Sequence, residues 1–300
     1  MTYILLVILS LLWGLSFLGT KILLEVMLPA EILAVRWTLA FVTFTILILL
    51  KVVKVDFKKK PIKLLLIAAA MQPCAYSILE TWGVNLTTSS ESSIFIAMVP
   101  LVVVLQERIF LKKKVSKLVM CAMMISFTGV LITVVFAPGF STGSKLIGYL
   151  ALIAAITVGS AYSVYSNKFN KSFSPVEITY ALAIAGMIFF NTLSLADGNG
   201  FSAYQRMFTD WETAAALVFL GVGCSCVAYL IFNYNLSRLP AAIVAVLQTN
   251  AITVVGVVAG IIFGGDPWGL YTVIGLAMAI TGICISSTED MKKSKLEKAK

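Results

Sequence analysis

Three charged residues stand within otherwise apolar stretches of the chain: Lys21, Arg36 and Glu80. A charge at the centre of a membrane helix costs roughly 2.5–3.5 kcal/mol, so each needs a partner or a function. In a structural interpretation, Lys21 and Arg36 extend their charged ends to the membrane surface, and one of them neutralises Glu80. In a functional interpretation, an ion pair among the three gates a central cavity, and Glu80 carries a coupling proton when it loses its partner.

Neutral polar side chains form a second group that could bind a ligand. Gln72 and Tyr76 are four residues apart, which places them on one face of a helix. Buried amides and aromatic rings also serve interhelical hydrogen bonds and packing, so a purely structural role is the alternative. The residues that we expect to bind substrate are Trp13, Gln72, Tyr76, Gln248 and Asn250, near the centres of apolar stretches, and Tyr229, nearer the end of one.

The sequence offers no catalytic or metal-binding constellation. It contains no histidine, the commonest metal ligand and the usual proton shuttle near neutral pH. All five cysteines lie in apolar runs, and Cys224-Ser225-Cys226 lacks the spacing and partner ligands of a metal site. No stretch reads as a phosphate-binding G-x-x-x-x-G-K-[ST] loop. We therefore expect no enzyme activity, no metal, no cofactor and no direct use of ATP.

The elements that position these residues must be membrane helices. Hydrophobic residues make up 60% of the 300 positions and charged residues 12%, whereas soluble domains carry roughly 25% charged residues. A bilayer core takes about 20 apolar residues per helix, and lipid offers no partner to backbone groups outside a helix. We predict an all-α membrane protein with ten transmembrane helices, at residues 3–24, 30–50, 62–84, 92–111, 116–137, 146–167, 176–196, 213–235, 240–264 and 268–288.

Basic residues predict how these helices are oriented. With the N-terminus inside, most of the 23 Lys and Arg residues fall in inside segments, and the outside loops hold only Lys145 and Arg206. We expect a multi-pass protein of the cell membrane (plasma or inner membrane) with both termini in the cytoplasm. The net charge of +9 is then explained by anionic lipid head groups at the inner loops, without nucleic acid as a partner.

An internal repeat runs through the chain. A polar start followed by two apolar helices occurs in each half, with Gly129 and Gly282 at matching positions 153 residues apart. Weaker similarity joins Pro29-Ala30-Glu31 to Pro175-Val176-Glu177, 146 residues later. A shift of half the chain length indicates a duplication.

The repeat defines the expected domains. Residues 1–138 form the first five-helix repeat, residues 139–288 the second, and residues 289–300 a basic cytoplasmic tail. Because five is odd, the second repeat enters the membrane from the opposite face. Inverted repeats of this kind underlie alternating access around a site near the midplane.

At this point the chain resembles the drug/metabolite transporter superfamily, in its ten-helix branch with two EamA-type repeats. The resemblance rests on Leu12-Trp13-Gly14, on Thr87–Pro100, on Lys112–Ser116 running to Gly129, and on Gly264–Pro267 running to Gly282. It covers essentially the whole chain. Where the family pattern has a glutamate in both turns, this chain has Lys113 and Asp266, so no residue role is carried over there. The resemblance implies a secondary carrier that moves small organic solutes, often outward.

Two kinds of carrier fit these observations. The first exports small polar metabolites, most notably amino acids, by alternating access around a midplane cavity. The alternative carries organic cations such as quaternary amines or drugs, with Trp13 and Tyr76 supplying a cation–π surface. A membrane enzyme is disfavoured because no catalytic constellation is present. The substrate, the direction, the coupling ion and the choice between monomer and weak homodimer stay open.

Overall fold

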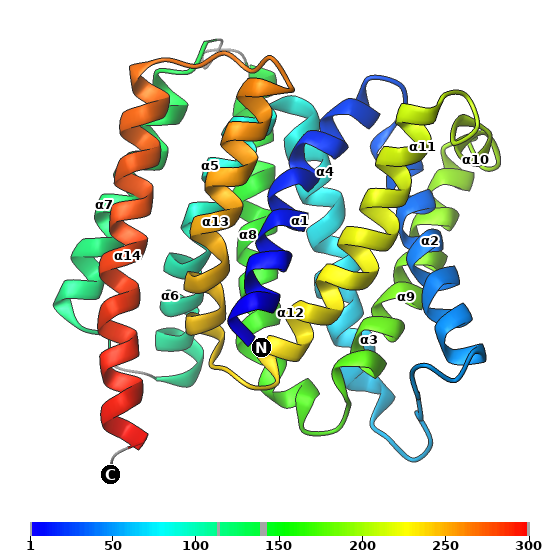
Figure 1. Ribbon diagram of the computed structural model, residues 1–300, viewed down its shortest axis with the longest axis horizontal. Coiled ribbons are helices and arrows are strands. Elements are labelled where there is room, and N and C mark those ends of the chain that lie inside the picture. Colours follow the sequence, from blue (N-terminus) through cyan, green and yellow to red (C-terminus); the bar gives the residue numbers. More distant parts are fainter. Residues whose placement is uncertain (1, 113–114, 139–142, 299–300) are drawn as a thin grey trace.

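The computed structural model describes residues 2–112, 115–138 and 143–298, with side chains between residues 4 and 285 apart from 113–114, 139–142 and 283. Every regular element within these residues is a helix (Figure 1). The first half forms α1 (Thr2–Leu24), α2 (Pro29–Leu49), α3 (Ile62–Ala69), η1 (Ala70–Tyr76), α4 (Ser77–Leu86), α5 (Ser89–Phe95), η2 (Ile96–Met98), α6 (Val99–Leu111) and α7 (Lys117–Val135). The second half forms α8 (Gly143–Asn170), α9 (Pro175–Ala196), α10 (Ser202–Arg206), α11 (Trp211–Val218), η3 (Phe219–Ala228), α12 (Tyr229–Leu236), α13 (Ala241–Ile262) and α14 (Leu270–Lys298).

Nine stretches of the described chain are long and apolar enough to cross a membrane. Three are composite, because α3, η1 and α4 form Ile62–Leu86, α5 to α6 form Ser89–Leu111, and α11 to α12 form Trp211–Leu236. The predicted all-helical membrane fold is confirmed. The tenth predicted span corresponds to the beginning of α14, where the described apolar part, Leu270–Gly282, is shorter. The count of ten therefore stays a prediction.

Parts of three sequence expectations lie outside the described residues. They are Lys113 in the basic turn after α6, the boundary between residues 138 and 139, and the side chains of the tail at 289–300. The backbone of the tail continues α14 as a helix up to Lys298.

The third span of each repeat contains a π-helical segment, η1 in the first repeat and η3 in the second. Such turns are rare and frequently occur at functional sites. In η1 the cause is Pro73, which has no backbone N–H and cannot complete the α-helical ladder. Just before Pro100 the chain forms a short 3₁₀ turn, η2, and the proline stands at the start of α6. The matching positions of η1 and η3 are a structural sign of the duplication.

The last helices of the two repeats, α7 and α14, pack against each other at one end of the molecule (Figure 1). A Cβ at Gly129 would lie 2.5 Å from the carbonyl oxygen of Gly275, and a Cβ at Gly282 would collide with the carbonyl oxygen of Ala122. Gly275 and Ala122 are also 153 residues apart, so the two helices make equivalent contacts on each other. Small residues allow this close approach of two backbones.

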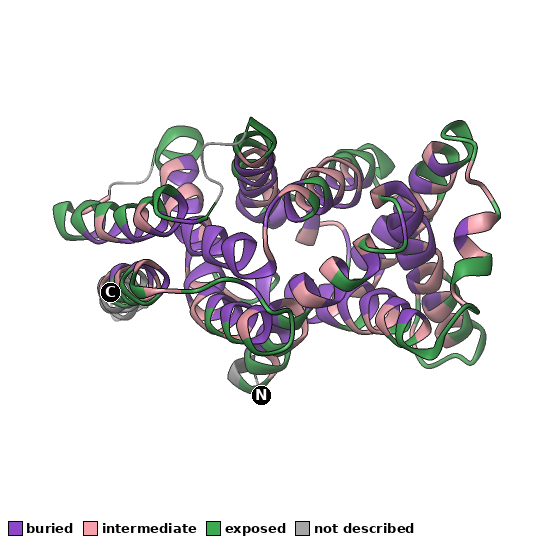
Figure 2. Cartoon of the chain, turned by 90° about the horizontal axis from the view of Figure 1, so that it is seen from above, coloured by how far each residue is buried: buried purple, intermediate pink, exposed green. Residues whose placement is uncertain are grey.

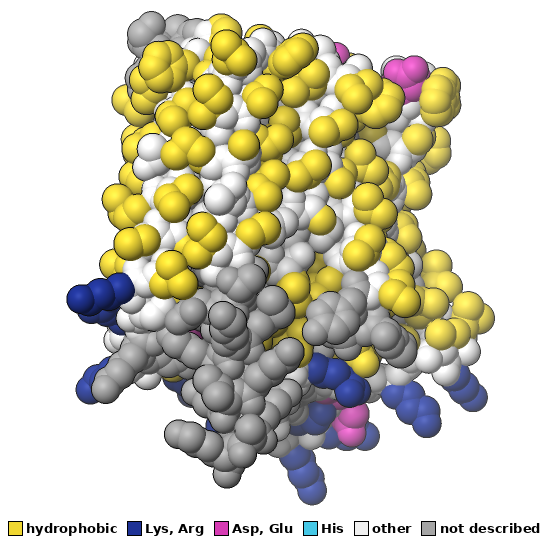
Figure 3. All heavy atoms as spheres, turned by 60° about the vertical axis from the view of Figure 1, so that its left-hand side comes forward, with side chains coloured by type: hydrophobic (Ala, Val, Ile, Leu, Met, Phe, Trp, Pro, Cys, Tyr) yellow, Lys and Arg dark blue, Asp and Glu magenta, His cyan; other side chains and the backbone are white. Residues whose placement is uncertain are grey.

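Apolar and basic side chains separate along the vertical axis of Figure 1. On the side seen in Figure 3, hydrophobic side chains cover a broad belt, and Lys and Arg side chains gather below it. Seen from above, buried residues lie toward the middle of the helical array and exposed residues on its rim (Figure 2). We call the end that holds the N-terminus, at the bottom of Figure 1, the lower face, and the opposite end the upper face. An apolar rim is the surface that lipid requires.

Candidate functional site

A cavity lies between the two repeats. The walls come from α1, α2, η1, α4, η2 and α6 of the first repeat and from α8, α12 and α13 of the second. They are lined by Trp13, Ser16, Phe17, Arg36, Gln72, Tyr76, Glu80, Ile96, Val99, Ile156, Gly159, Ser160, Ser163, Tyr229, Phe232, Gln248 and Ile252.

Five of the six residues expected to bind substrate line this cavity, and the exception is Asn250. Its Nδ2 atom lies 3.7 Å from Sγ of Cys284 on α14. Asn250 and Gln248 stand two residues apart on α13, a rotation of about 200° around an α-helix. Gln248 therefore faces the cavity, and Asn250 faces α14.

One face of the third span carries a row of polar groups at four-residue spacing: Gln72, Tyr76 and Glu80. The Gln72 amide donates a hydrogen bond to the hydroxyl of Tyr229 over 2.7 Å. The Tyr76 hydroxyl donates one to the carboxylate of Glu80, also over 2.7 Å. Gln72 and Tyr76 were predicted to share one helical face, and Glu80 lies on the same face. The sequence had instead indicated a role for Glu80 in a gating ion pair.

Gly159 on α8 makes room for the ring of Tyr76. A Cβ at this glycine would lie 2.8 Å from the ring, which is closer than carbon atoms approach without repulsion. The glycine lets α8 pack against the third span at this point, with Tyr76 held beside Glu80.

Arg36 and Glu80 border the same cavity without pairing. Arg36 is only 4% exposed, and its Nε donates to Oγ of Ser225 in η3 over 2.6 Å. Within the described chain, no ion pair with an N···O distance of 4.0 Å or less joins Arg36 to Glu80, and the hydrogen bond to Ser225 uses only the Nε hydrogen of Arg36.

Lys21 lies apart from these two charges. Its ammonium group donates to the carbonyl oxygens of Val84, Asn85 and Thr87 at 3.2, 3.3 and 2.6 Å. These carbonyls end α4, where the helix dipole favours a cation. The ion pair proposed among Lys21, Arg36 and Glu80 is therefore not formed in this structure.

An apolar cluster separates the cavity from the upper face. Phe17, Val84, Ile96 and Ile252 are all buried and contact one another, although they come from four different spans. Lys21 stands one helical turn beyond Phe17 and ties α1 to the end of α4.

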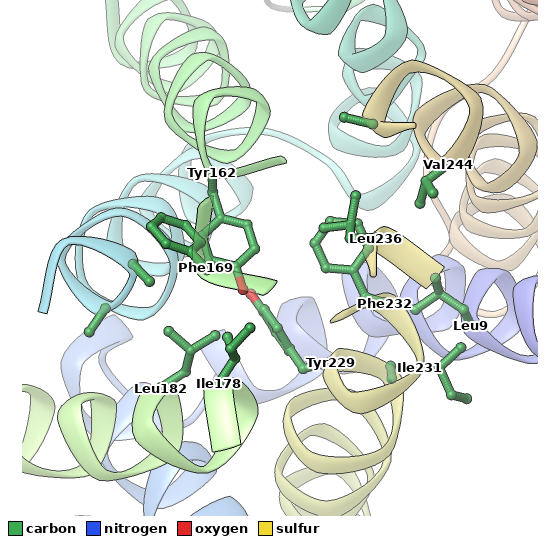
Figure 4. Packing of buried hydrophobic residues seen from close by; sticks show 14 of the residues in the cluster. Leu9, Tyr162, Phe169, Ile178, Leu182, Tyr229, Ile231, Phe232, Leu236 and Val244 are labelled. Atoms are coloured by element: carbon green, nitrogen blue, oxygen red, sulfur yellow. The ribbon is translucent and has the colours of Figure 1, made fainter. Parts of the chain in front are cut away.

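Aromatic residues close the cavity toward the lower face. Tyr229 and Phe232 pack edge-on against Trp13, with ring centroids 5.3 and 5.0 Å from it. Figure 4 shows the hydroxyl ends of Tyr162 and Tyr229 directed toward one another. The Tyr162 hydroxyl donates to the side-chain oxygen of Asn233. Tyr229 was expected nearer the end of its span, and the packing brings it into this lower closure together with Tyr162.

The sequence analysis did not identify several of the residues that line the cavity. Ser16, Ser160 and Ser163 line the cavity, but small hydroxyl residues are common in membrane helices and give no distinctive signal. Gly159 followed by Ser160 within an apolar helix was the available hint. Trp37 is fully buried beside Tyr229, with ring centroids 5.4 Å apart.

The cavity holds polar atoms that have no partner within the described chain. They include Oε1 of Gln72, Oε1 of Gln248 and Oγ of Ser160, all fully buried. A buried polar atom without a hydrogen bond costs about 1–3 kcal/mol. No cluster of metal-ligating side chains occurs among the residues that the structure describes. The arrangement is suited to binding a polar solute.

Comparisons with known proteins agree with this architecture. The model of the EamA-like transporter family matches residues 1–135 and 146–288. The uncharacterized transporter YcxC of Bacillus subtilis (strain 168) is 27% identical over 296 residues, which cover 98% of this chain and 95% of the relative. An uncharacterized transporter of Archaeoglobus fulgidus is 26% identical over 274 residues, covering 91% of this chain and 94% of the relative.

A solved structure shares the fold. It is described only as a crystal structure of a protein, and it aligns with a TM-score of 0.72 over 96% of both chains at 17% sequence identity. At this identity the similarity speaks for the fold alone.

Proposed function

Because the chain belongs to the EamA-like transporter family, we propose that it is a secondary active transporter that carries small polar metabolites, most notably amino acids, out of the cell. It works by alternating access around the central cavity.

The observation that carries this proposal is a set of buried polar atoms without a hydrogen-bond partner among the described residues, which belong to residues that line the cavity. Gln72, Gln248 and Ser160 come from both repeats and offer acceptors and a hydroxyl that nothing in the described chain satisfies. A solute with amino and carboxyl groups supplies the missing donors and acceptors. An apolar solute would leave these groups unsatisfied at a cost of about 1–3 kcal/mol each.

Alternating access is supported by the inverted repeat and by the two closures of the cavity. The apolar cluster around Phe17 lies above the cavity, and the aromatic cluster around Tyr229 lies below it. In inverted-repeat carriers one repeat moves against the other around a fixed site. Opening of one closure at a time would expose the cavity to one side of the membrane.

The basic lower face is proposed to lie in the cytoplasm, with both termini. The Lys and Arg side chains that gather below the apolar belt in Figure 3 fit the bias of cytoplasmic loops toward basic residues. They also place cations beside anionic lipid head groups.

A carrier of organic cations is the second candidate, and the aromatic wall favours it. Trp13 forms one edge of a cluster with Tyr229 and Phe232, and a quaternary amine binds well on such faces. Arg36 in the same cavity opposes it, because it repels a cation.

Counterflow in proteoliposomes tests the proposal. Vesicles loaded with an unlabelled amino-acid mixture should accumulate labelled amino acid saturably, whereas vesicles loaded with choline should not accumulate choline. A pH gradient applied to the wild type and to Glu80→Gln shows whether Glu80 couples protons. Choline flux without amino-acid flux would support the cation carrier, and no exchange of any solute would refute the carrier.

A matched pair of variants ties the flux to the cavity. Gly159→Leu should abolish exchange, because it displaces Tyr76 and fills the cavity. Gly143→Leu should leave exchange intact, because a Cβ at Gly143 meets nothing within 4 Å.

A further inference from the structure

Two opposite charges line one buried cavity without forming an ion pair, and this arrangement indicates which charges a ligand must carry. Arg36 and Glu80 both line the cavity. No ion pair within 4.0 Å joins them in the described structure. In a membrane interior, unpaired charges are costly and usually mark a substrate pathway.

Neutral partners hold each charge in place. Ser225 accepts the Nε hydrogen of Arg36 and is itself fully buried. Tyr76 donates to one oxygen of Glu80, and Gly159 shapes the space for the Tyr76 ring. Each charge thus keeps free hydrogen-bonding capacity: two terminal nitrogens on Arg36, and the second carboxylate oxygen on Glu80.

The charge of the ligand follows from this pair. A carboxylate alone would satisfy Arg36 and be repelled by Glu80, while an amine alone would satisfy Glu80 and be repelled by Arg36. A ligand with both groups close together satisfies both charges and adds no net charge to the cavity. Arginine binds carboxylates through two parallel hydrogen bonds. A half-ligand, which carries only the carboxylate or only the amine, leaves one of the two protein charges unpaired and therefore binds more weakly.

The rest of the wall restricts the side chain of that ligand. Phe17, Ile96 and Ile252 are apolar and line the cavity, and the charged residues among the lining are Arg36 and Glu80. A third charge on the ligand would have no partner there, whereas an aliphatic or aromatic group would be buried against apolar carbon.

Resting on the proposed function of this cavity as the transport site, we propose that Arg36 binds the carboxylate and Glu80 the ammonium group of a zwitterionic amino acid with an apolar side chain. Ser225 and Tyr76 are the positioning residues, and neither charge is a gate partner of the other.

Competition in the counterflow assay tests the dipolar recognition. Unlabelled leucine, leucinamide, isocaproate and isoamylamine are compared as inhibitors of labelled leucine exchange. The amide and the carboxylic acid lacking the amine should inhibit roughly 10- to 100-fold more weakly than leucine, the factor expected for losing one hydrogen-bonded charge. Isoamylamine, which lacks the carboxylate, should be equally weak.

Single substitutions should reverse this preference. Arg36→Gln should raise the KM for leucine by roughly 10- to 100-fold and make isoamylamine the better ligand, whereas Glu80→Gln should favour isocaproate. A merely structural role would not exchange one half-ligand for the other. Arg36→Lys should recover part of the leucine exchange. Arg238→Gln and Glu212→Gln, at positions outside the cavity lining, serve as matched controls.

The outcomes separate this inference from the general function. Equal inhibition by leucine, leucinamide and isoamylamine would overturn the dipolar site and leave the carrier intact. Undiminished leucine exchange in the double variant Arg36→Gln/Glu80→Gln would also overturn it. Absence of exchange for every solute in the wild type would instead refute the carrier itself.

Discussion

Glu31 and Glu177 occupy the same position in the two repeats and make the same kind of contact at opposite ends of the α2–α9 pair. Glu31 accepts the backbone N–H of Leu28 at the start of α2 over 2.8 Å and contacts Arg206, with 3.6 Å between Nε and Oε1. Glu177 accepts the N–H of Ser174 at the start of α9 over 2.9 Å and pairs with Lys60 at 2.7 Å.

Each glutamate therefore holds the segment that follows the other helix. Arg206 belongs to the connection after α9, and Lys60 to the connection after α2. The helices α2 and α9 pack antiparallel (Figure 1). The contact of Glu31 with Arg206 therefore links them near one face of the membrane, and the contact of Glu177 with Lys60 links them near the other.

Removing these carboxylates should destabilise the protein unequally. Glu177→Ala should lower the free energy of unfolding by about 1–3 kcal/mol, because hydrogen bonds to a charged group are lost. Glu31→Ala should cost less, because its pair with Arg206 is longer and Arg206 is more exposed than Lys60. Thermal unfolding in detergent measures both, with the exposed Glu212→Ala as control. An equal loss in all three variants would contradict the fastening role.

The glycines between α7 and α14 should tolerate no side chain. Gly129→Ala places a Cβ 2.5 Å from the carbonyl oxygen of Gly275, and backbone atoms cannot move aside as a side chain can. We expect a loss of about 1–3 kcal/mol, typical of overpacking, and a similar loss for Gly282→Ala. The control is Gly223→Ala, where the nearest atom is an ordinary 3.5 Å away. Unfolding temperatures that match those of the control would show that α7 and α14 separate freely.

The tie between Lys21 and the end of α4 should hold the upper closure shut. Lys21→Met removes three hydrogen bonds from an ammonium group, worth about 1–2 kcal/mol, or a factor of about 5–30 in the open population. In a chain with its native cysteines replaced by serine, a cysteine introduced by Ser160→Cys should react faster with a maleimide. Lys171→Met, on an exposed turn, is the control. An unchanged rate of maleimide reaction in Lys21→Met would show that the Lys21 hydrogen bonds do not hold the upper closure shut.

Gln248 and Asn250, two amides on opposite faces of α13, should behave differently. Gln248→Leu removes a cavity-facing amide and should raise the substrate KM about tenfold, equivalent to about 1.4 kcal/mol. Asn250→Leu should leave the KM unchanged, because Asn250 faces Cys284 on α14. Counterflow at varied substrate concentration distinguishes the two. A larger effect at Asn250 than at Gln248 would mean that the transporting state rotates α13.

Much of the fold was determined by local sequence. Lipid forces the backbone into helices, so apolar length alone located the spans, as Ile62–Leu86 and Ser89–Leu111 illustrate. The duplication was visible because Gly129 and Gly282 recur at a fixed distance, and the same packing requirement in α7 and α14 explains why both are glycine.

Which residues meet was decided by tertiary structure. Depth in the membrane can be estimated along the chain, and it placed Lys21, Arg36 and Glu80 at a similar height. The direction of a side chain depends on the rotation of its helix against partners far away in sequence, so the chain alone did not separate Gln248 from Asn250. Nor did it show that Lys21 binds backbone carbonyls, because a carbonyl acceptor leaves no mark in the residue types. The sequence supplied the charges and the repeat, and only the packing of the two repeats decided which charges share a cavity.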